Sequence, residues 1–283
     1  MADQPPFGIY PLLKRFANKI GCTWFLVAIE NALLALIPLL IGFAIDGLLA
    51  GNIDDLMNLA AVFLLLIVIS VVRRIFDTRA YGSIRIALGL EVDDHHKKEL
   101  VSIRNARLNM ARELVDFLEE DVPELFTAVI QLSVAIIILA FIEPTLAYSA
   151  VVLLVVMVGI YAGFHQRFYR LNIAINNQAE QQVSILNQNC NKGLKQHLCN
   201  LRSQEVRLSD ADAILYGLIF VFICLFILCN LSLSSTLVGI TAGTIFSIVS
   251  YSWEFSESAI ALPMTMQKLS RLNEISQRLN KLQ

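Results

Sequence analysis

Two carboxylates stand inside a stretch of sequence that otherwise has the character of a membrane helix. Residues 247–264 read SIVSYSWEFSESAIALPM, and Glu254 and Glu257 interrupt the apolar side chains. A charged group in the hydrocarbon of a bilayer costs about 3 kcal/mol, so such groups face a cavity, pair with a partner or take up a proton. Glu254 and Glu257 therefore have the chemistry to bind a cationic group or to exchange a proton.

The polar residues around these glutamates repeat with the period of an α-helix. Successive members of the set lie three or four residues apart, which places them on one face over about four turns. Glu30 lies about eight residues into the first apolar segment, so we expect it at a similar depth. The candidate residues for a substrate or proton cavity are Glu30, Ser247, Ser250, Tyr251, Glu254 and Glu257.

The sequence leaves three interpretations of the glutamates open. In the first, the last apolar helix protrudes from the membrane, and Glu254 and Glu257 are solvated at its inner interface. In the second, they line a cavity for cationic or peptide-like substrates. In the third, they exchange protons, because carboxylates held close together in a partly dry site take up protons more readily.

A second group of chemically capable residues is the run Asp93-Asp94-His95-His96. All four are metal-ligand types, but adjacent side chains on a helix point about 100° apart. Lys97 follows directly, which is typical of a solvated face. We therefore predict no metal site, and the sequence contains no motif for a cofactor.

The elements that must position these residues are membrane helices. Of the 283 residues, 56% are hydrophobic and only 16% are charged, with a net charge of -2. This composition indicates a membrane protein and excludes the basic surface that binds nucleic acid. Segments of about 20 apolar residues predict six spans. The predicted spans cover about residues 22–49, 56–76, 123–142, 144–165, 211–231 and 236–263.

The distribution of positive charge predicts the orientation. All 22 Lys and Arg residues lie in the N-terminal segment, the two long polar segments or the C-terminal tail, and the short loops carry none. By the positive-inside rule, both termini and both long segments are cytoplasmic. Apolar residues at helical spacing over about 8–20 predict an interfacial elbow helix before the first span. We expect a single all-α transmembrane domain over residues 1–283, with long cytoplasmic helical extensions.

The order of several short motifs resembles the six-helix transmembrane domain of the ABC exporters. The segment IPLLIGFAIDGLLAG is similar to the end of that family's first helix. The segment AREL…DFLEEDVPELF resembles the stretch before its third helix, and ITAGTIFSIVSY resembles the start of its sixth. The matching residues are Pro38, Gly42, Asp46, Glu113, Leu114, Asp121, Val122, Gly243, Tyr251 and Pro263.

The resemblance implies a transporter subunit that pairs with another six-helix chain, as a homodimer or a heterodimer in the inner (plasma) membrane. The sequence contains no G-x-x-x-x-G-K-[ST] loop, so we expect no nucleotide-binding domain, no catalysis by this chain and a separate ATPase subunit. The expected cargo is an amphipathic compound, a peptide or a lipid. The coupling surface that the resemblance implies comprises Arg107, Asn109, Arg112, Glu113, Asn189 and Lys192.

Two other functions fit the same sequence. One is an ATP-independent, proton-coupled carrier of peptides or drugs that uses the same kind of membrane domain. The other is a membrane partner of another transporter that does not itself transport.

Overall fold

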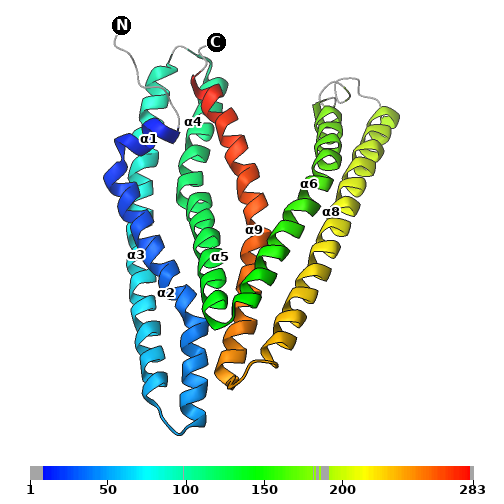
Figure 1. Ribbon diagram of the computed structural model, residues 1–283. Helices are drawn as coiled ribbons and strands as arrows, with labels where there is room; N and C mark the ends of the chain where they lie inside the picture. Colours follow the sequence, from blue (N-terminus) through cyan, green and yellow to red (C-terminus); the bar gives the residue numbers. More distant parts are fainter. Residues whose placement is uncertain (1–8, 98, 181, 183–184, 186–190, 281–283) are drawn as a thin grey trace. The chain divides into compact units, whose positions relative to one another are not determined.

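The computed structural model describes residues 9–97, 99–180, 182, 185 and 191–280, and the described elements are helices (Figure 1). The described α-helices range from seven residues to 44 residues in length. A five-residue π-helical segment, η1, joins α4 to α5. The elements are α1 (Ile9–Arg15), α2 (Ala17–Leu49), α3 (Asp54–His95), α4 (Val101–Asp116), η1 (Phe117–Asp121), α5 (Val122–Ile142), α6 (Pro144–Glu180), α8 (Asn191–Ser234) and α9 (Ala242–Asn280).

Five helices within the described residues are long and apolar enough to cross a membrane. The helix α9 is not one of them, because its described part carries Glu254, Glu257 and several serines among its apolar residues. The all-α membrane fold is confirmed, whereas the sixth span stays a prediction. The five are Ala17–Leu49, Asp54–His95, Arg104–Ile142, Pro144–Ile175 and Asn191–Ser234.

The first of two compact units contains the residues up to Glu143 and those from Ser234 onward. Within it, α2 packs against α3, α5 and α9, and α5 packs against α9. A hydrophobic core cluster forms where α1, α2, α3, α4 and η1 meet, in the extension beyond the predicted spans. This core consists of Leu12, Ile20, Tyr81, Ile84, Leu88, Val92, Ala111, Leu114, Val115, Phe117 and Leu118.

The N-terminal elbow differs from its predicted extent. Instead of one helix over 8–20, α1 ends at Arg15 and α2 begins at Ala17. Phe16 between them has φ −109° and ψ 24°, which lies outside the helical region. The chain therefore turns at Phe16, and the following residues already belong to α2.

The second unit, from Pro144 to Leu233, is an antiparallel pair of helices. The Ser149 hydroxyl near the start of α6 donates to Asn230 Oδ1 near the end of α8, at 2.6 Å. The Gln178 side chain near the end of α6 lies 2.7 Å from His197 Nδ1 near the start of α8. These polar contacts fix the register of the two helices along their length.

Candidate substrate pocket between α2 and α9

The N-terminus of α9 is capped by Thr241, the residue just before the helix, and by Asp46 of α2. The Thr241 hydroxyl accepts from the Thr244 backbone N–H at 3.1 Å, which is the usual N-cap contact. Asp46 of α2 accepts from the Gly243 N–H at 2.8 Å and from the Thr241 hydroxyl at 2.5 Å. A carboxylate at a helix N-terminus also interacts favourably with the helix dipole. Asp46 therefore ties the end of α2 to the start of α9.

The two helices approach most closely at a pair of glycines. A Cβ atom on Gly243 would overlap the Gly42 carbonyl oxygen, and a Cβ atom on Gly42 would lie 2.7 Å from the Gly243 carbonyl oxygen. Both overlaps involve backbone, which cannot move aside as a flexible side chain can. Gly239 has no atom within 4 Å of a Cβ and instead takes φ +76° in the turn before α9. The close approach thus depends on Gly42 and Gly243.

The next turns of α9 bind carbonyl groups around the proline of α2. Pro38 has no N–H and interrupts the helical hydrogen-bond ladder at this point. The Ser247 hydroxyl donates to the Pro38 carbonyl at 3.1 Å, and the Tyr251 hydroxyl donates to the Ala35 carbonyl at 2.8 Å. Ser247 and Tyr251 are buried and fix α9 against α2.

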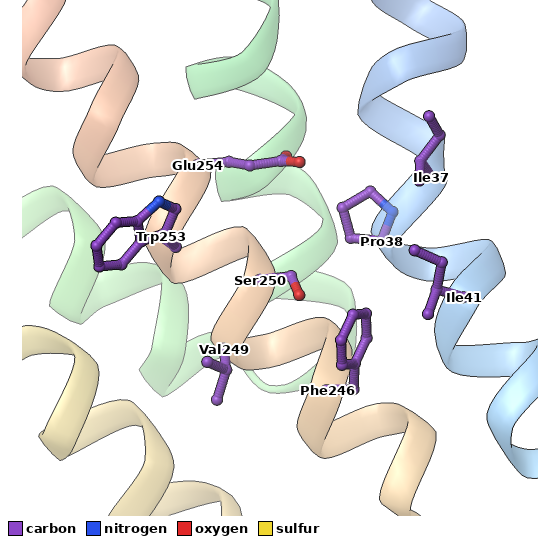
Figure 2. Close-up of a pocket in the computed structure, with 8 residues that line it drawn as sticks. All are labelled: Ile37, Pro38, Ile41, Phe246, Val249, Ser250, Trp253 and Glu254. Carbon is purple, nitrogen blue, oxygen red and sulfur yellow. The ribbon is translucent and has the colours of Figure 1, made fainter.

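Beside this contact line, α2 and α9 enclose an open pocket of about 420 Å³. Figure 2 shows the Glu254 carboxylate and the Ser250 hydroxyl pointing from α9 into the space that faces α2. The Trp253 and Val249 side chains lie on the flank of α9. The lining residues are Ile37, Pro38, Ile41, Phe246, Val249, Ser250, Trp253 and Glu254.

The lining of this pocket has the chemistry of a site for an amphipathic molecule. Its wall is aliphatic and aromatic, and Glu254 supplies its carboxylate. A ligand pocket of this kind takes its affinity from apolar contact and its orientation from a few polar groups. A cation attached to an apolar body satisfies both parts, with Glu254 as the counter-ion for its charge.

The family of the chain follows from comparison with known proteins. A family model described as the ABC transporter transmembrane region matches residues 10–243. The chain belongs to this family. It is therefore a membrane transporter subunit, and the resemblance to ABC exporters is confirmed. A search of curated proteins finds no match.

The residues that match the ABC transmembrane family form only one wall of the pocket. Its α2 wall lies inside the matched residues, whereas its α9 wall, including Ser250 and Glu254, lies beyond residue 243. The family assignment consequently says nothing specific about Glu254, and the role of this glutamate depends on the geometry alone.

The polar residues that the sequence places on one face of α9 have different neighbours in the structure. Ser250 and Glu254 line the pocket, while Ser247 and Tyr251 bind α2. Ser258, on the same face, donates to Gln131 of α5 at 2.9 Å. The Glu257 side chain is exposed. One helical face thus contacts three different environments.

Glu30 lies in a different cluster from the glutamates of α9. Its Oε1 accepts from the Ser70 hydroxyl at 2.5 Å, and its Oε2 forms an ion pair with Arg73 of α3. Glu30 is not among the residues that line the pocket. The sequence had grouped these carboxylates in one cavity. In the structure Glu254 lines the pocket, whereas Glu30 is paired with Arg73 elsewhere.

The predicted coupling residues differ in their accessibility. On α4, Asn109 and Arg112 are exposed, whereas Arg107 is only 8% exposed and cannot offer much surface to a partner. Lys192 is exposed at the start of α8 in the second unit. Glu113 on α4 is half-buried, and Asn189 lies outside the described residues.

The two aspartates in the Asp93–His96 segment at the end of α3 form ion pairs. Asp93 binds Arg104 at 2.6 Å, and Asp94 binds Lys97 at 2.5 Å. The hydrogen bond and charge of Asp94 raise the pKa of Lys97 above its usual range. Across the described residues, no group of three or more His, Cys, Asp and Glu side chains is arranged to hold a metal ion.

The apolar wall of the pocket was not singled out from the sequence. Ile37, Ile41 and Phe246 are ordinary membrane-helix residues, and their spacing gives no sign of a pocket. Trp253 carried a usable signal, because it directly precedes the candidate Glu254 in the sequence.

Proposed function

We propose that this ABC transmembrane subunit moves amphipathic compounds that carry a positive charge, with energy from a separate ATPase chain. The pocket at Glu254 is the observation that carries the proposal, because it joins one carboxylate to an apolar wall. Peptides with basic residues, cationic drugs and lipids with amine headgroups belong to this class. We further propose that two six-helix chains, identical or different, form the pathway in the inner membrane, with their termini in the cytoplasm.

The proposed ATPase subunit needs an accessible contact surface. Asn109 and Arg112 on α4 are exposed and follow the turn that joins α3 to α4. They are therefore the α4 candidates best placed to reach a separate chain. Lys192 on α8 is a second candidate for the same role.

Purification in a mild detergent from native membranes tests whether a separate ATPase chain binds this subunit. We expect a nucleotide-binding chain in stoichiometric amount, together with ATP hydrolysis that rises when a transported cation is added. The double variant N109A/R112A should reduce this recovery, whereas E257Q should not. Stoichiometric recovery of the subunit with no nucleotide-binding chain, and transport that continues without ATP in liposomes, would contradict the ATP-driven form of the proposal.

Glu254→Gln tests the pocket. Tetraphenylphosphonium is a suitable probe because it joins one positive charge to an apolar surface. Tetraphenylphosphonium cannot donate a hydrogen bond, so the glutamine removes only the Coulomb attraction of the carboxylate, about 1.5 kcal/mol or more at a partly buried site, and we expect the affinity to fall about tenfold. Equilibrium dialysis of the purified protein measures the binding, and transport should fall in parallel.

Glu257→Gln is the matched control, since Glu257 is a neighbouring glutamate that does not line the pocket. Its affinity for tetraphenylphosphonium should stay within about twofold of the unmodified protein. Equal losses in the two variants would assign the effect to the general negative charge of α9 and overturn the pocket.

A further inference from the structure

A second ionic cluster lies between α2 and α3, apart from the pocket. Arg73 of α3 forms an ion pair with Glu30 of α2 and donates from Nη1 to Asp77 Oδ2 at 3.0 Å. Glu30 is 9% exposed and Asp77 is 5% exposed. One guanidinium is therefore shared between two buried carboxylates, and a buried charge is stable only when it is paired.

The two carboxylates are not equally satisfied. Glu30 uses both oxygens, since Oε1 accepts from Ser70 and Oε2 pairs with Arg73. Asp77 uses only Oδ2, and its Oδ1 is buried without a hydrogen-bond partner. An ionised oxygen that is buried and receives no hydrogen bond is strongly disfavoured. A proton on Asp77 Oδ1 removes both the surplus charge and the unsatisfied acceptor.

With both carboxylates ionised, Glu30, Asp77 and Arg73 together carry one net negative charge. The other groups that interact with Asp77 are Thr23 on α2, Tyr81 on α3 and Glu119 on η1, and the Lys19 ammonium of α2 donates to Ser83 of α3 at 2.7 Å. Glu119 pairs with Arg85 at 2.5 Å and adds no cation to the cluster.

A metal cation fits less well than a proton, because both Glu30 oxygens and one Asp77 oxygen are already bound to other groups. From these contacts we infer that Asp77 holds an exchangeable proton at the α2–α3 interface. The ligand of this site is the proton itself. The site gives the chain a response to pH that does not require the substrate pocket or an ATPase partner.

Infrared difference spectroscopy of the full chain in lipid nanodiscs, recorded as the pH is varied, tests the proton. The unmodified protein should show the carbonyl band of a protonated carboxyl that disappears as the pH rises. Asp77→Asn should remove one such band, and Glu257→Gln should leave that band in place. A band that survives in D77N, or a spectrum of the unmodified protein without any titrating carboxyl, would overturn the inference.

Glu30→Gln provides a second test that keeps Asp77 intact. With Glu30 neutral, Arg73 serves Asp77 alone, so the midpoint of the Asp77 band should move down by about one pH unit or more. An unchanged midpoint would overturn the inference even if D77N did not fold. Because tetraphenylphosphonium binding is measured at a different site, failure of one proposal leaves the other standing.

Discussion

Replacement of Gly243 by alanine should destabilise the first unit by about 3 kcal/mol, the upper part of the range for overpacking a close contact. The added Cβ would overlap the Gly42 carbonyl oxygen and lie 2.6 Å from Asp46 Oδ2. Alanine also favours a helix over glycine by about 1 kcal/mol. The overlap should outweigh this gain, because the atoms that must move belong to the backbone of α2 and to the cap of α9.

Thermal unfolding of the purified protein, followed by its helical circular dichroism, measures this effect. Gly217→Ala on α8 is the matched control, because a Cβ there meets no atom within 4 Å. We expect this control to be neutral or slightly stabilising. If G243A and G217A unfold at the same temperature, the glycine contact between α2 and α9 is absent.

The sequence could predict the helices because each is a local pattern. Apolar length, the missing charges in short loops and the position of Asp46 near the end of a span are all properties of one segment. The pairing of segments is different. Gly243 packs against Gly42, which lies far away in the chain, and only the packed structure establishes the register between α2 and α9.

The candidate site shows the same limit. Helical periodicity grouped the polar residues of α9 on one face, yet it could not say what lies opposite each of them. Tyr251 faces a carbonyl of α2, whereas Glu254 faces the pocket. Glu30 was grouped with Glu254 by depth alone, and its real neighbour is Arg73 of α3.

Replacement of Arg73 by methionine should destabilise the protein by about 3 kcal/mol, the lower end of the range for breaking a buried ion pair. The lower end applies because the Arg73 side chain is 24% exposed and water can reach part of it. Methionine keeps much of the apolar stem but leaves the buried Glu30 carboxylate without a counter-charge and Asp77 Oδ2 without its hydrogen-bond donor. The same unfolding measurement detects the loss.

Arg74→Met is the matched control. Arg74 is the next residue on α3 and its side chain is exposed, so its loss should cost less than about 0.5 kcal/mol. Equal destabilisation by R73M and R74M would mean that any positive charge at this level of α3 stabilises the protein and that the ion pair with Glu30 does not.

The triple variant E30Q/R73M/D77N separates the two parts of the Arg73 effect. If the cost of R73M comes from uncompensated buried charge, removal of the two carboxylates should recover most of the lost stability. If it comes from lost packing, the triple variant should be no more stable than R73M. Recovery in the triple variant would tie the stability of the α2–α3 interface to the pairing of its buried charges.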